Sequence, residues 1–479
     1  MSLNEQRPTI VWFRQDLRLG DNPALKAALD ENRPIILLYI YDENFASPWS
    51  IQGASLWWLG QSLLFLERKI KYFKNKLILK RGSVLNLIPH IIRETRAISL
   101  HWNRCYEPSS INRDTLLKEK LQKQGIEVTS HNALLLSEPW HNLNQSKQPF
   151  KVFTPFWNRL RNNLNISYTY WYPKHLPCPD KFPESDNLKE WKLDPFWSKK
   201  FKSYWQPGED HAEKQLDDFI QKKIFNYSKK RDYPYDACTS RMSPYLHWGE
   251  ISPARIWSKT IQQSFYKDAS TEQIESFLRQ LGWREFCHSL LFYWPTFPAQ
   301  AWQDKFNNFP WNDKEEHFNA WCCGRTGYPF IDAAMQELWQ TGWMHNRARM
   351  VVASFLIKDL LIPWQKGEAW FWDTLVDADL AQNSSNWQWV AGSGADASPY
   401  FRIFNPILQS KKFDPQGNYI RQWLPILKNL SDNDIHTPWK LSKEKLKDCG
   451  LVLGKNYPYP IVDHEVARKK ALNAYKALV

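Results

Sequence analysis

The sequence predicts an α/β N-terminal domain, built on a doubly wound, five-stranded parallel sheet, followed by an all-α C-terminal domain. Two observations predict this division. The first 130 residues alternate short apolar runs with stretches of helical periodicity, which is typical of a parallel sheet with helices on both faces. After residue 208 the apolar residues keep helical spacing, and no convincing alternating strand follows. The chain has 479 residues, more than one hydrophobic core usually organises, so two domains are the default.

Five apolar runs in the N-terminal part are expected to be buried strands, at residues 9–13, 35–41, 76–80, 97–102 and 126–130. The stretches between them are expected to be helices, near residues 23–30, 54–73, 84–94 and 110–124. The first of these helices has Asn22 as a capping residue and Pro23 at an early position, which is a typical helix start.

Ligands of parallel α/β sheets bind beyond the carboxyl ends of the strands. In this chain Arg14, Asp16 and the loop 103–107 are expected at that edge, where they could line a pocket. The alternative is that Arg14 and Asp16 only tie this loop to a helix, and the residues by themselves favour the alternative.

Residues 137–207 contain nine prolines among Trp, Lys and Tyr, a composition that opposes long regular elements. They predict an extended interdomain linker. The expected boundaries are therefore 1–136 for the α/β domain, 137–207 for the linker and 208–479 for the all-α domain.

The composition is globular but rich in indole, with 27 Trp among 15% aromatic residues. Stacking against planar ligands, electron transfer and core packing each account for such a content. The net charge of +13 suits a polyanionic partner such as nucleic acid, although general solubility is an alternative. Seven cysteines without repeated spacing favour a reducing compartment. No signal sequence or run of about 18 apolar residues occurs, so we expect a cytoplasmic protein without a membrane span.

Residues 324–406 hold the densest mixture of Trp, Arg, Asn and Asp in the chain. Pro329 and Gly342 delimit a predicted helix over 330–341. A second helix is predicted over 346–361, before Pro363, which places Asn346 and Met350 one turn apart on one face. The polar residues 377–386 predict an irregular, site-forming loop. Asp377 and Asp379 lack a His or Cys at ligand spacing, so a transition-metal site is rejected.

The segment 239–244 offers three hydroxyls and a guanidinium, from Thr239, Ser240, Arg241 and Ser243, at the start of a helical stretch. Hydroxyls, free helix-terminal N–H groups and arginine bind phosphate well. Ordinary capping of the helix is the alternative.

Four motifs together resemble the photolyase/cryptochrome family, most of all the bacterial class I cyclobutane pyrimidine dimer photolyases. They are VWFRQDLRLGDNPAL at 11–25, RDYPYDACTSRMSPYLHWGEISP at 231–253, QLGWREF at 280–286 and the stretch 324–406. The resemblance spans nearly the whole chain. It implies an FAD-binding C-terminal domain and an antenna chromophore, a folate or a deazaflavin, in the N-terminal domain. It also implies blue-light repair of DNA by a carbon–carbon lyase, in which excited reduced FAD donates an electron to the dimer.

The resemblance implies a set of positions that bind FAD: Tyr227, Thr239, Ser240, Arg241, Met242, Ser243, Phe277, Gln280, Arg284, Asn346, Arg349, Asp377, Ala378, Asp379 and Asn383. Within this set Asp377 is expected to pair with Arg349. Asn383 is expected to face flavin N5, where a neutral amide suits a reduced ring. Plant cryptochromes carry Asp at that position, so Asn383 favours repair over signalling.

The residues expected to handle the lesion are Gln280, Trp283, Asn346, Met350, Trp389 and Asn383. Photolyases flip the dimer out of the duplex, and two indoles, Trp283 and Trp389, could wall it by stacking. Because (6-4) photolyases carry histidines at the positions of Asn346 and Met350, these residues favour the cyclobutane dimer. Gln280 departs from the pattern, since cyclobutane-dimer enzymes usually have glutamate there, and we expect altered efficiency or lesion preference.

Trp311, Trp364 and Trp387 match the chain of tryptophans that passes electrons from the surface to excited flavin; without the resemblance they would be assigned to the core. The positions that match DNA-phosphate contacts are Arg231, Arg347, Arg402 and Gln409. The expected partner is DNA containing pyrimidine dimers, bound by a monomer. A cryptochrome photoreceptor, a (6-4) photolyase and a basic nucleic-acid adaptor without flavin stay open as alternatives.

Overall fold

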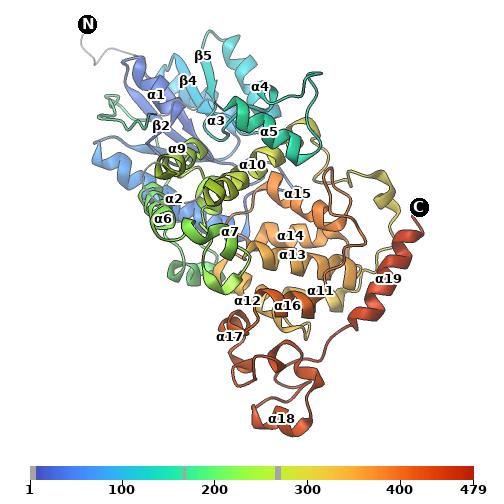
Figure 1. Cartoon of the computed structure of the whole chain (residues 1–479). Coiled ribbons are helices and arrows are strands. Elements are labelled where there is room, and N and C mark those ends of the chain that lie inside the picture. The colour runs from blue at the N-terminus through green and yellow to red at the C-terminus, as the bar shows by residue number, and fades with distance from the viewer. Residues whose placement is uncertain (1–6, 165–168, 265–270, 479) are drawn as a thin grey trace. The chain divides into compact units, whose positions relative to one another are not determined.

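The computed structural model describes residues 7–164, 169–264 and 271–478. Figure 1 shows the helices and strands of the chain. Contacts group the residues into two compact units. Unit 1 comprises Met1–Phe225 and Ser240–Pro295, and unit 2 comprises Asn226–Thr239 and Thr296–Val479. The expected linker 137–207 therefore belongs to unit 1 by its contacts, and the domain boundaries at 136 and 207 stay predictions.

Unit 1 contains a five-stranded parallel sheet in the order β3-β2-β1-β4-β5. The strands are β1 Thr9–Phe13, β2 Ile35–Tyr41, β3 Leu77–Arg81, β4 Ser99–Asn103 and β5 Glu127–His131, and the helices that connect them are α1 Pro23–Asp30, α2 Gly53–Tyr72, α3 Val84–Thr95 and α4 Pro108–Gln122. Asn22 caps α1 as predicted, because its side chain accepts a hydrogen bond from Leu25 N–H at 3.1 Å. The predicted doubly wound α/β fold is confirmed.

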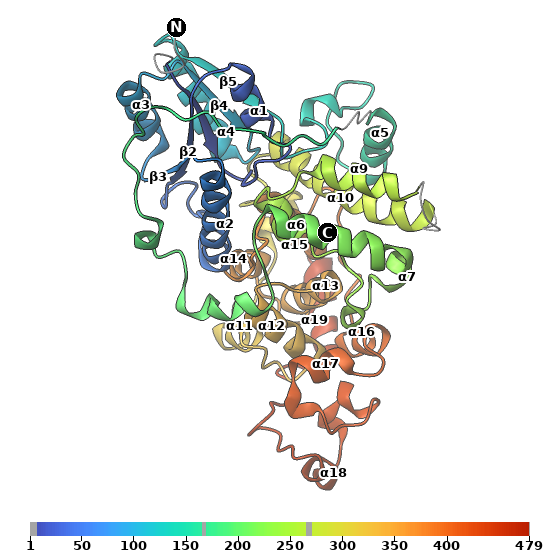
Figure 2. The same ribbon diagram turned by 90° about the vertical axis from the view of Figure 1, so that its left-hand side faces the viewer.

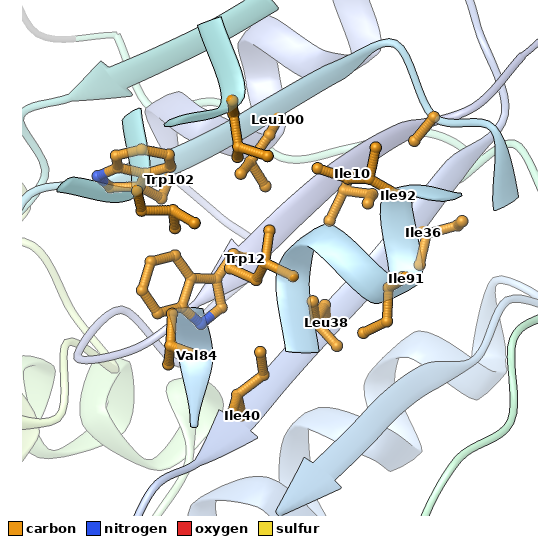
Figure 3. Close-up of a cluster of buried hydrophobic side chains, with 14 of the residues drawn as sticks. Ile10, Trp12, Ile36, Leu38, Ile40, Val84, Ile91, Ile92, Leu100 and Trp102 are labelled. Atoms are coloured by element: carbon orange, nitrogen blue, oxygen red, sulfur yellow. The ribbon is translucent and has the colours of Figure 1, made fainter. Parts of the chain in front are cut away.

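The sheet is covered on both faces, with α1 and α3 on opposite sides of the strands (Figure 2). On the α3 side, Ile10 and Trp12 of β1 pack with Leu38 of β2, with Trp102 of β4 and with Ile91 of α3 (Figure 3). These apolar residues bury one face of the sheet, as expected for strands that helices cover on both sides.

Arg14 and Asp16 are both buried at the carboxyl edge of the sheet. Arg14 forms an ion pair with Asp114 of α4 and donates to the carbonyl of Asn103, while Asp16 accepts from the Asn103 amide. These contacts confirm the alternative in which the two residues tie the loop to a helix.

Outside residues 165–168, which the structure does not describe, the proline-rich stretch 137–207 contains one α-helix, α5 Phe153–Asn163, and 3-10 turns at Pro139–His141, Leu188–Trp191 and Phe196–Ser203. Trp157 and Trp191 are buried, so these two indoles pin the stretch to unit 1. The predicted scarcity of long regular elements is confirmed.

After residue 208 the regular elements of the described residues are helices joined by loops and turns, and one isolated bridge pairs Leu453 with Tyr457. The helices are α6 Glu209–Lys222, α7 Tyr227–Lys230, α8 Ser243–His247, α9 Pro253–Ser264, α10 Thr271–Tyr293, α11 Glu315–Cys322, α12 Pro329–Thr341, α13 Asn346–Ser354, α14 Trp364–Thr374, α15 Leu380–Ala391, α16 Pro406–Phe413, α17 Asn418–Trp423, α18 Lys443–Asp448 and α19 His464–Lys476. The all-α prediction is confirmed. None of the described helices has the length and apolar character needed to cross a bilayer.

Two predictions for residues 324–406 need correction. The helix expected over 346–361 is α13 continued by a π-helical turn, η8 Phe355–Asp359. The prediction of an irregular loop over 377–386 is wrong, because α15 begins at Leu380. The physical reason is that the Asp379 carboxylate accepts from Gln382 N–H at 2.9 Å, so a polar residue starts the helix instead of opposing it. The helix between Pro329 and Gly342 is confirmed, with Gly342 left-handed at φ 68°.

Candidate functional site

The residues singled out in the sequence fall in both units, and each group has its own local geometry. In unit 1 the segment Ser240–Ser243 is held by α6, because Gln215 Nε2 donates to the Ser240 carbonyl at 2.8 Å. Arg241 is left-handed at φ 54°, and its guanidinium lies 4.1 Å from the centre of the Trp205 ring. Ser243, the first residue of α8, is exposed. The segment thus presents hydroxyl and guanidinium donors on a fixed backbone, which suits anionic oxygens.

Helix α10 carries the other candidates of unit 1. The Trp283 ring stacks on the Phe153 ring of α5, with centroids 3.6 Å apart and planes 7° apart. Gln280 Nε2 turns back to the Ser276 carbonyl at 3.1 Å. Phe277 is buried against Phe219, and Arg284 donates to the Leu134 carbonyl at 2.7 Å. The α5 stack therefore fixes the orientation of the indole that is expected to wall the lesion.

In unit 2, α13 presents Asn346, Arg347 and Met350 together. Met350 Sδ lies 3.8 Å from Asn346 Nδ2 and 3.9 Å from Arg347 Nη1, so the predicted common face is confirmed. The helix is capped by His345, whose Nδ1 accepts from Arg347 N–H at 3.2 Å. Burial lowers the pKa of His345 to about 4, so its ring is neutral near pH 7. An amide, a thioether and a guanidinium thus share one turn of helix.

The expected ion pair between Arg349 and Asp377 is present. Arg349 Nη2 lies 2.8 Å and 3.1 Å from the two Asp377 oxygens, and Arg349 Nε donates to the Met344 carbonyl at 2.8 Å. Ala378 and Asp379 follow, both buried, with Asp379 capping α15. The capping bond and the ion pair hold this polar segment in one conformation.

Asn383 is 8% exposed on α15, and its Nδ2 donates to the backbone carbonyl of Glu368 on α14 at 3.0 Å. The Glu368 carboxyl accepts from the Ser384 hydroxyl, and burial raises its pKa to about 8. Sequence analysis missed Glu368. Its signal was an acid between Gly367 and Ala369 on a tryptophan-rich helix that carries other polar residues, and that signal is too weak to assign a role.

Of the three expected relay tryptophans, Trp364 and Trp387 are buried and Trp311 is half-buried. The Trp387 ring meets Phe371 at 5.0 Å and Trp321 at 6.3 Å, whereas Trp311 meets Phe309 at 4.3 Å. Trp321, which the sequence did not single out, is fully buried and donates its Nε1–H to the Val352 carbonyl at 3.0 Å. Trp389, on the same helix as Trp387, is half-buried.

The four residues expected to contact DNA phosphates differ in the side chains that they contact within the protein. Arg347 Nη2 forms a 2.7 Å ion pair with Asp232, and its guanidinium lies 4.3 Å from the centre of the Phe413 ring. Arg231 lies 5.3 Å from the Tyr227 ring, and Tyr227 itself is buried. Arg402 is exposed and makes no salt bridge with any residue of the described ranges. Gln409 is half-buried on α16.

Comparison with known proteins gives the class. Residues 9–180 match the family described as DNA photolyase, and residues 277–477 match the FAD binding domain of DNA photolyase. The chain belongs to the DNA photolyase family.

Three relatives show which members of the family the chain resembles. A deoxyribodipyrimidine photo-lyase of Agrobacterium fabrum is 47% identical over 98% of this chain and 98% of its own. A crystal structure titled as a bacterial class III photolyase from Agrobacterium tumefaciens has a TM-score of 0.95 at 47% identity, covering 99% of this chain and 98% of that one. Cryptochrome-2 of Arabidopsis thaliana is 38% identical over 97% of this chain and 78% of its own.

These matches confirm the family resemblance and the expected enzyme class, a deoxyribodipyrimidine photo-lyase. The expected class I subfamily is not confirmed, because the solved relative at 47% identity is titled class III.

The chemistry of the candidate residues fits FAD. The hydroxyls and guanidinium of Ser240–Ser243 are donors of the kind that a diphosphate requires. The buried Asn383 amide and the Arg349–Asp377 pair offer both donors and acceptors, as the polar edge of an isoalloxazine requires. Within the described ranges, no group of three His, Cys, Asp or Glu side chains is placed to hold a metal ion.

Proposed function

We propose that this protein repairs cyclobutane pyrimidine dimers in DNA under blue light. The observation that carries the proposal is the trio on α13, where the Asn346 amide, the Met350 thioether and the Arg347 guanidinium meet. An amide can bond the edge of a pyrimidine, a thioether supplies an adaptable apolar wall, and a guanidinium can hold the adjoining phosphate. The proposal includes a monomer that works in the cytoplasm.

In this proposal the protein binds and orients while the cofactor supplies the reactive electron. FAD, when bound and reduced, supplies on excitation the electron that opens the cyclobutane ring and receives it back, with no net redox change. Trp283 and Trp389 stack on the flipped-out bases, and Asn346 with Gln280 bonds their edges. Asn383, oriented by its hydrogen bond to the Glu368 carbonyl, would offer its amide to the polar edge of the flavin.

Other residues act before and around this step. Arg231, Arg347, Arg402 and Gln409 hold the phosphates on either side of the lesion without reading sequence. Trp311, Trp364 and Trp387 would conduct electrons from an external reductant at the surface toward the bound flavin. A second chromophore, a folate or a deazaflavin, would harvest light in the N-terminal part.

The test is a repair assay with two lesions. Flavin-loaded, reduced protein is illuminated with duplex DNA that carries either one cyclobutane thymine dimer or one (6-4) product, and the restored strand is quantified by chromatography. We expect repair of the cyclobutane dimer, no repair in the dark, and no repair of the (6-4) product. Repair of the (6-4) product alone would overturn the lesion assignment. Gln280→Glu serves as the companion variant and is expected to raise the repair rate, because a carboxylate accepts more strongly from the pyrimidine N–H groups.

A cryptochrome photoreceptor is the second candidate, because Cryptochrome-2 of Arabidopsis thaliana matches 97% of the chain at 38% identity. It predicts light-dependent flavin reduction without repair of either lesion in the same assay. Asn383, a neutral amide, favours repair between the two candidates.

A further inference from the structure

A buried lysine lies beneath one of the residues expected to meet DNA. Lys358 belongs to η8 Phe355–Asp359, the π-helical turn that continues α13, and it is 1% exposed. Burying an amine is costly unless it is hydrogen-bonded, and π-turns inside helices frequently occur at functional sites. A lysine at this position therefore needs a specific hydrogen-bond acceptor.

Lys358 holds the backbone of a distant segment, residues 400–404. Its Nζ donates to the carbonyl of Arg402 at 3.0 Å and lies 5.1 Å from the centre of the Tyr400 ring. One turn earlier, the Ser354 hydroxyl accepts from Phe404 N–H at 3.3 Å. Two side chains of α13 and η8 thus fix the segment at two backbone atoms, on either side of residue 403.

The segment is anchored by one buried side chain, and the two residues that follow it are exposed. Tyr400 is 2% exposed and stacks on Tyr475 of α19, with centroids 4.6 Å apart and planes 10° apart. Phe401 is 66% exposed, and Arg402 is exposed. Throughout the described ranges Arg402 has no acidic partner in an ion pair, which leaves its charge available for a phosphate.

We propose that Lys358 is a positioning residue for DNA binding, whose hydrogen bond to the Arg402 carbonyl presents the Arg402 guanidinium and the Phe401 ring to DNA. This inference rests on the proposed function, because it takes Arg402 as a phosphate contact. Lys358 itself is too deeply buried to touch DNA.

The role of Lys358 is that of a hydrogen-bond donor, and its charge is secondary. Burial lowers the pKa of Lys358 to about 7, with the neighbouring Asp359 opposing that shift and Arg402 adding to it. Asp359 is in turn hydrogen-bonded to His464 of α19. Because an ammonium and a neutral amine both donate, the bond to the Arg402 carbonyl survives partial loss of the proton.

The experiment uses Lys358→Met in the full, flavin-loaded protein. Methionine has a similar length and apolar character but no donor, so the carbonyl of Arg402 loses its partner. We expect a Kd for lesion-bearing duplex that is higher by about 2- to 10-fold, as the loss of one hydrogen bond implies. The KM should rise by a similar factor while kcat at saturating DNA stays unchanged, and the salt dependence should weaken, because the Arg402 phosphate contact is impaired.

A double-mutant cycle with Arg402→Ala separates positioning from a general structural role. If Lys358 acts through Arg402, Lys358→Met adds no further loss of affinity in the Arg402→Ala background. An equal loss in both backgrounds, or no loss in either, overturns the proposal. Lys305→Met is the matched control, because Lys305 lies 5.0 Å from the Tyr475 ring of the same aromatic cluster but is exposed. It should leave the Kd unchanged.

Two further variants distinguish the loss of a hydrogen bond from misfolding of the protein. Lys358→Gln keeps a donor and should recover part of the affinity. Ser354→Ala removes the second backbone tie and should also raise the Kd. A Kd for Lys358→Gln as high as that of Lys358→Met, together with an unchanged Kd for Ser354→Ala, would count against the proposal. Failure of the proposed function would look different, as wild-type protein that binds DNA but repairs no dimer in light.

Discussion

At the scale of single residues, Glu368 shows how burial sets protonation beside the candidate flavin residues. The side chain is 0% exposed, and its Oε2 has no hydrogen-bond partner within the described ranges. Burial raises its pKa to about 8, and the hydrogen bond from Ser384 only partly offsets this shift. The carboxyl is therefore mostly protonated at pH 7 and adds little negative charge behind the Asn383 amide.

Glu368→Gln should flatten part of the pH dependence of stability. The pKa of Glu368 is raised from 4.5 to about 8 on folding, so the folded protein holds a proton that the unfolded chain releases between these values. The contribution is full below about pH 4.5 and is lost as the pH rises through about 8. Between pH 5 and pH 8 the free energy of unfolding should fall less in the variant, by on the order of 1–3 kcal/mol. Thermal unfolding at four pH values measures this.

The control for that experiment is Glu316→Gln, which changes an exposed acid of α11. Its pH profile should run parallel to that of the wild type. A Glu368→Gln profile that is also parallel to wild type would mean that the carboxyl is ionised in the folded protein.

At the scale of elements, α13, α14 and α15 lie beside one another in unit 2 and carry most of its candidate residues (Figure 1). A glycine sets the closest approach between two of them. A Cβ placed on Gly367 of α14 would lie 2.2 Å from Trp387 Cη2 of α15. Unit 1 has the same arrangement, because a Cβ on Gly282 of α10 would lie 2.3 Å from Trp157 Cε3 of α5. Each unit thus seats an indole against a helix backbone.

Gly367→Ala should displace the Trp387 ring and destabilise unit 2 by about 1–3 kcal/mol, which is typical of overpacking. Because Trp387 belongs to the expected chain of electron-transfer tryptophans, we also expect slower photoreduction, measured as the loss of oxidised-flavin absorbance under blue light. Ala369→Gly, at an exposed site of the same helix, should cost about 1 kcal/mol through helix propensity and leave the rate unchanged. A Gly367→Ala protein with wild-type stability and rate would contradict the packing argument.

At the scale of the whole molecule, the net charge of +13 is the property most directly tied to the proposed partner. Excess positive charge speeds encounter with a polyanion and binds it without reading sequence. The three candidate arginines add local contacts to this field. Arg347 is already paired with Asp232, whereas Arg402 has an exposed guanidinium without an ionic partner in the described ranges.

DNA binding should depend steeply on salt. For three arginine–phosphate contacts we expect log Kd to rise with log salt concentration at a slope of about 3, because each contact releases counterions. Fluorescence anisotropy of a labelled duplex at several salt concentrations measures the slope. An undamaged duplex should bind more weakly with a similar slope. A slope near zero for both would remove the arginines from the interface.

Local patterns predicted much of the fold. The five strands, the Asn22 cap and the helix between Pro329 and Gly342 follow from periodicity, capping and backbone restrictions, which act over a few residues. The loop expected over 377–386 failed because Asp379 caps a helix, and the same residue type serves loops and helix starts.

For the candidate site, the sequence by itself determined the family, the basic charge and the common face of Asn346 and Met350, because motifs, composition and i,i+4 spacing are properties of the chain. Only the tertiary structure decided the roles of Glu368 and Lys358. Their partners, Asn383 and Arg402, lie 15 and 44 residues away. A side chain's burial, and with it its pKa and its hydrogen bonds, depends on residues that folding brings together from distant parts of the sequence.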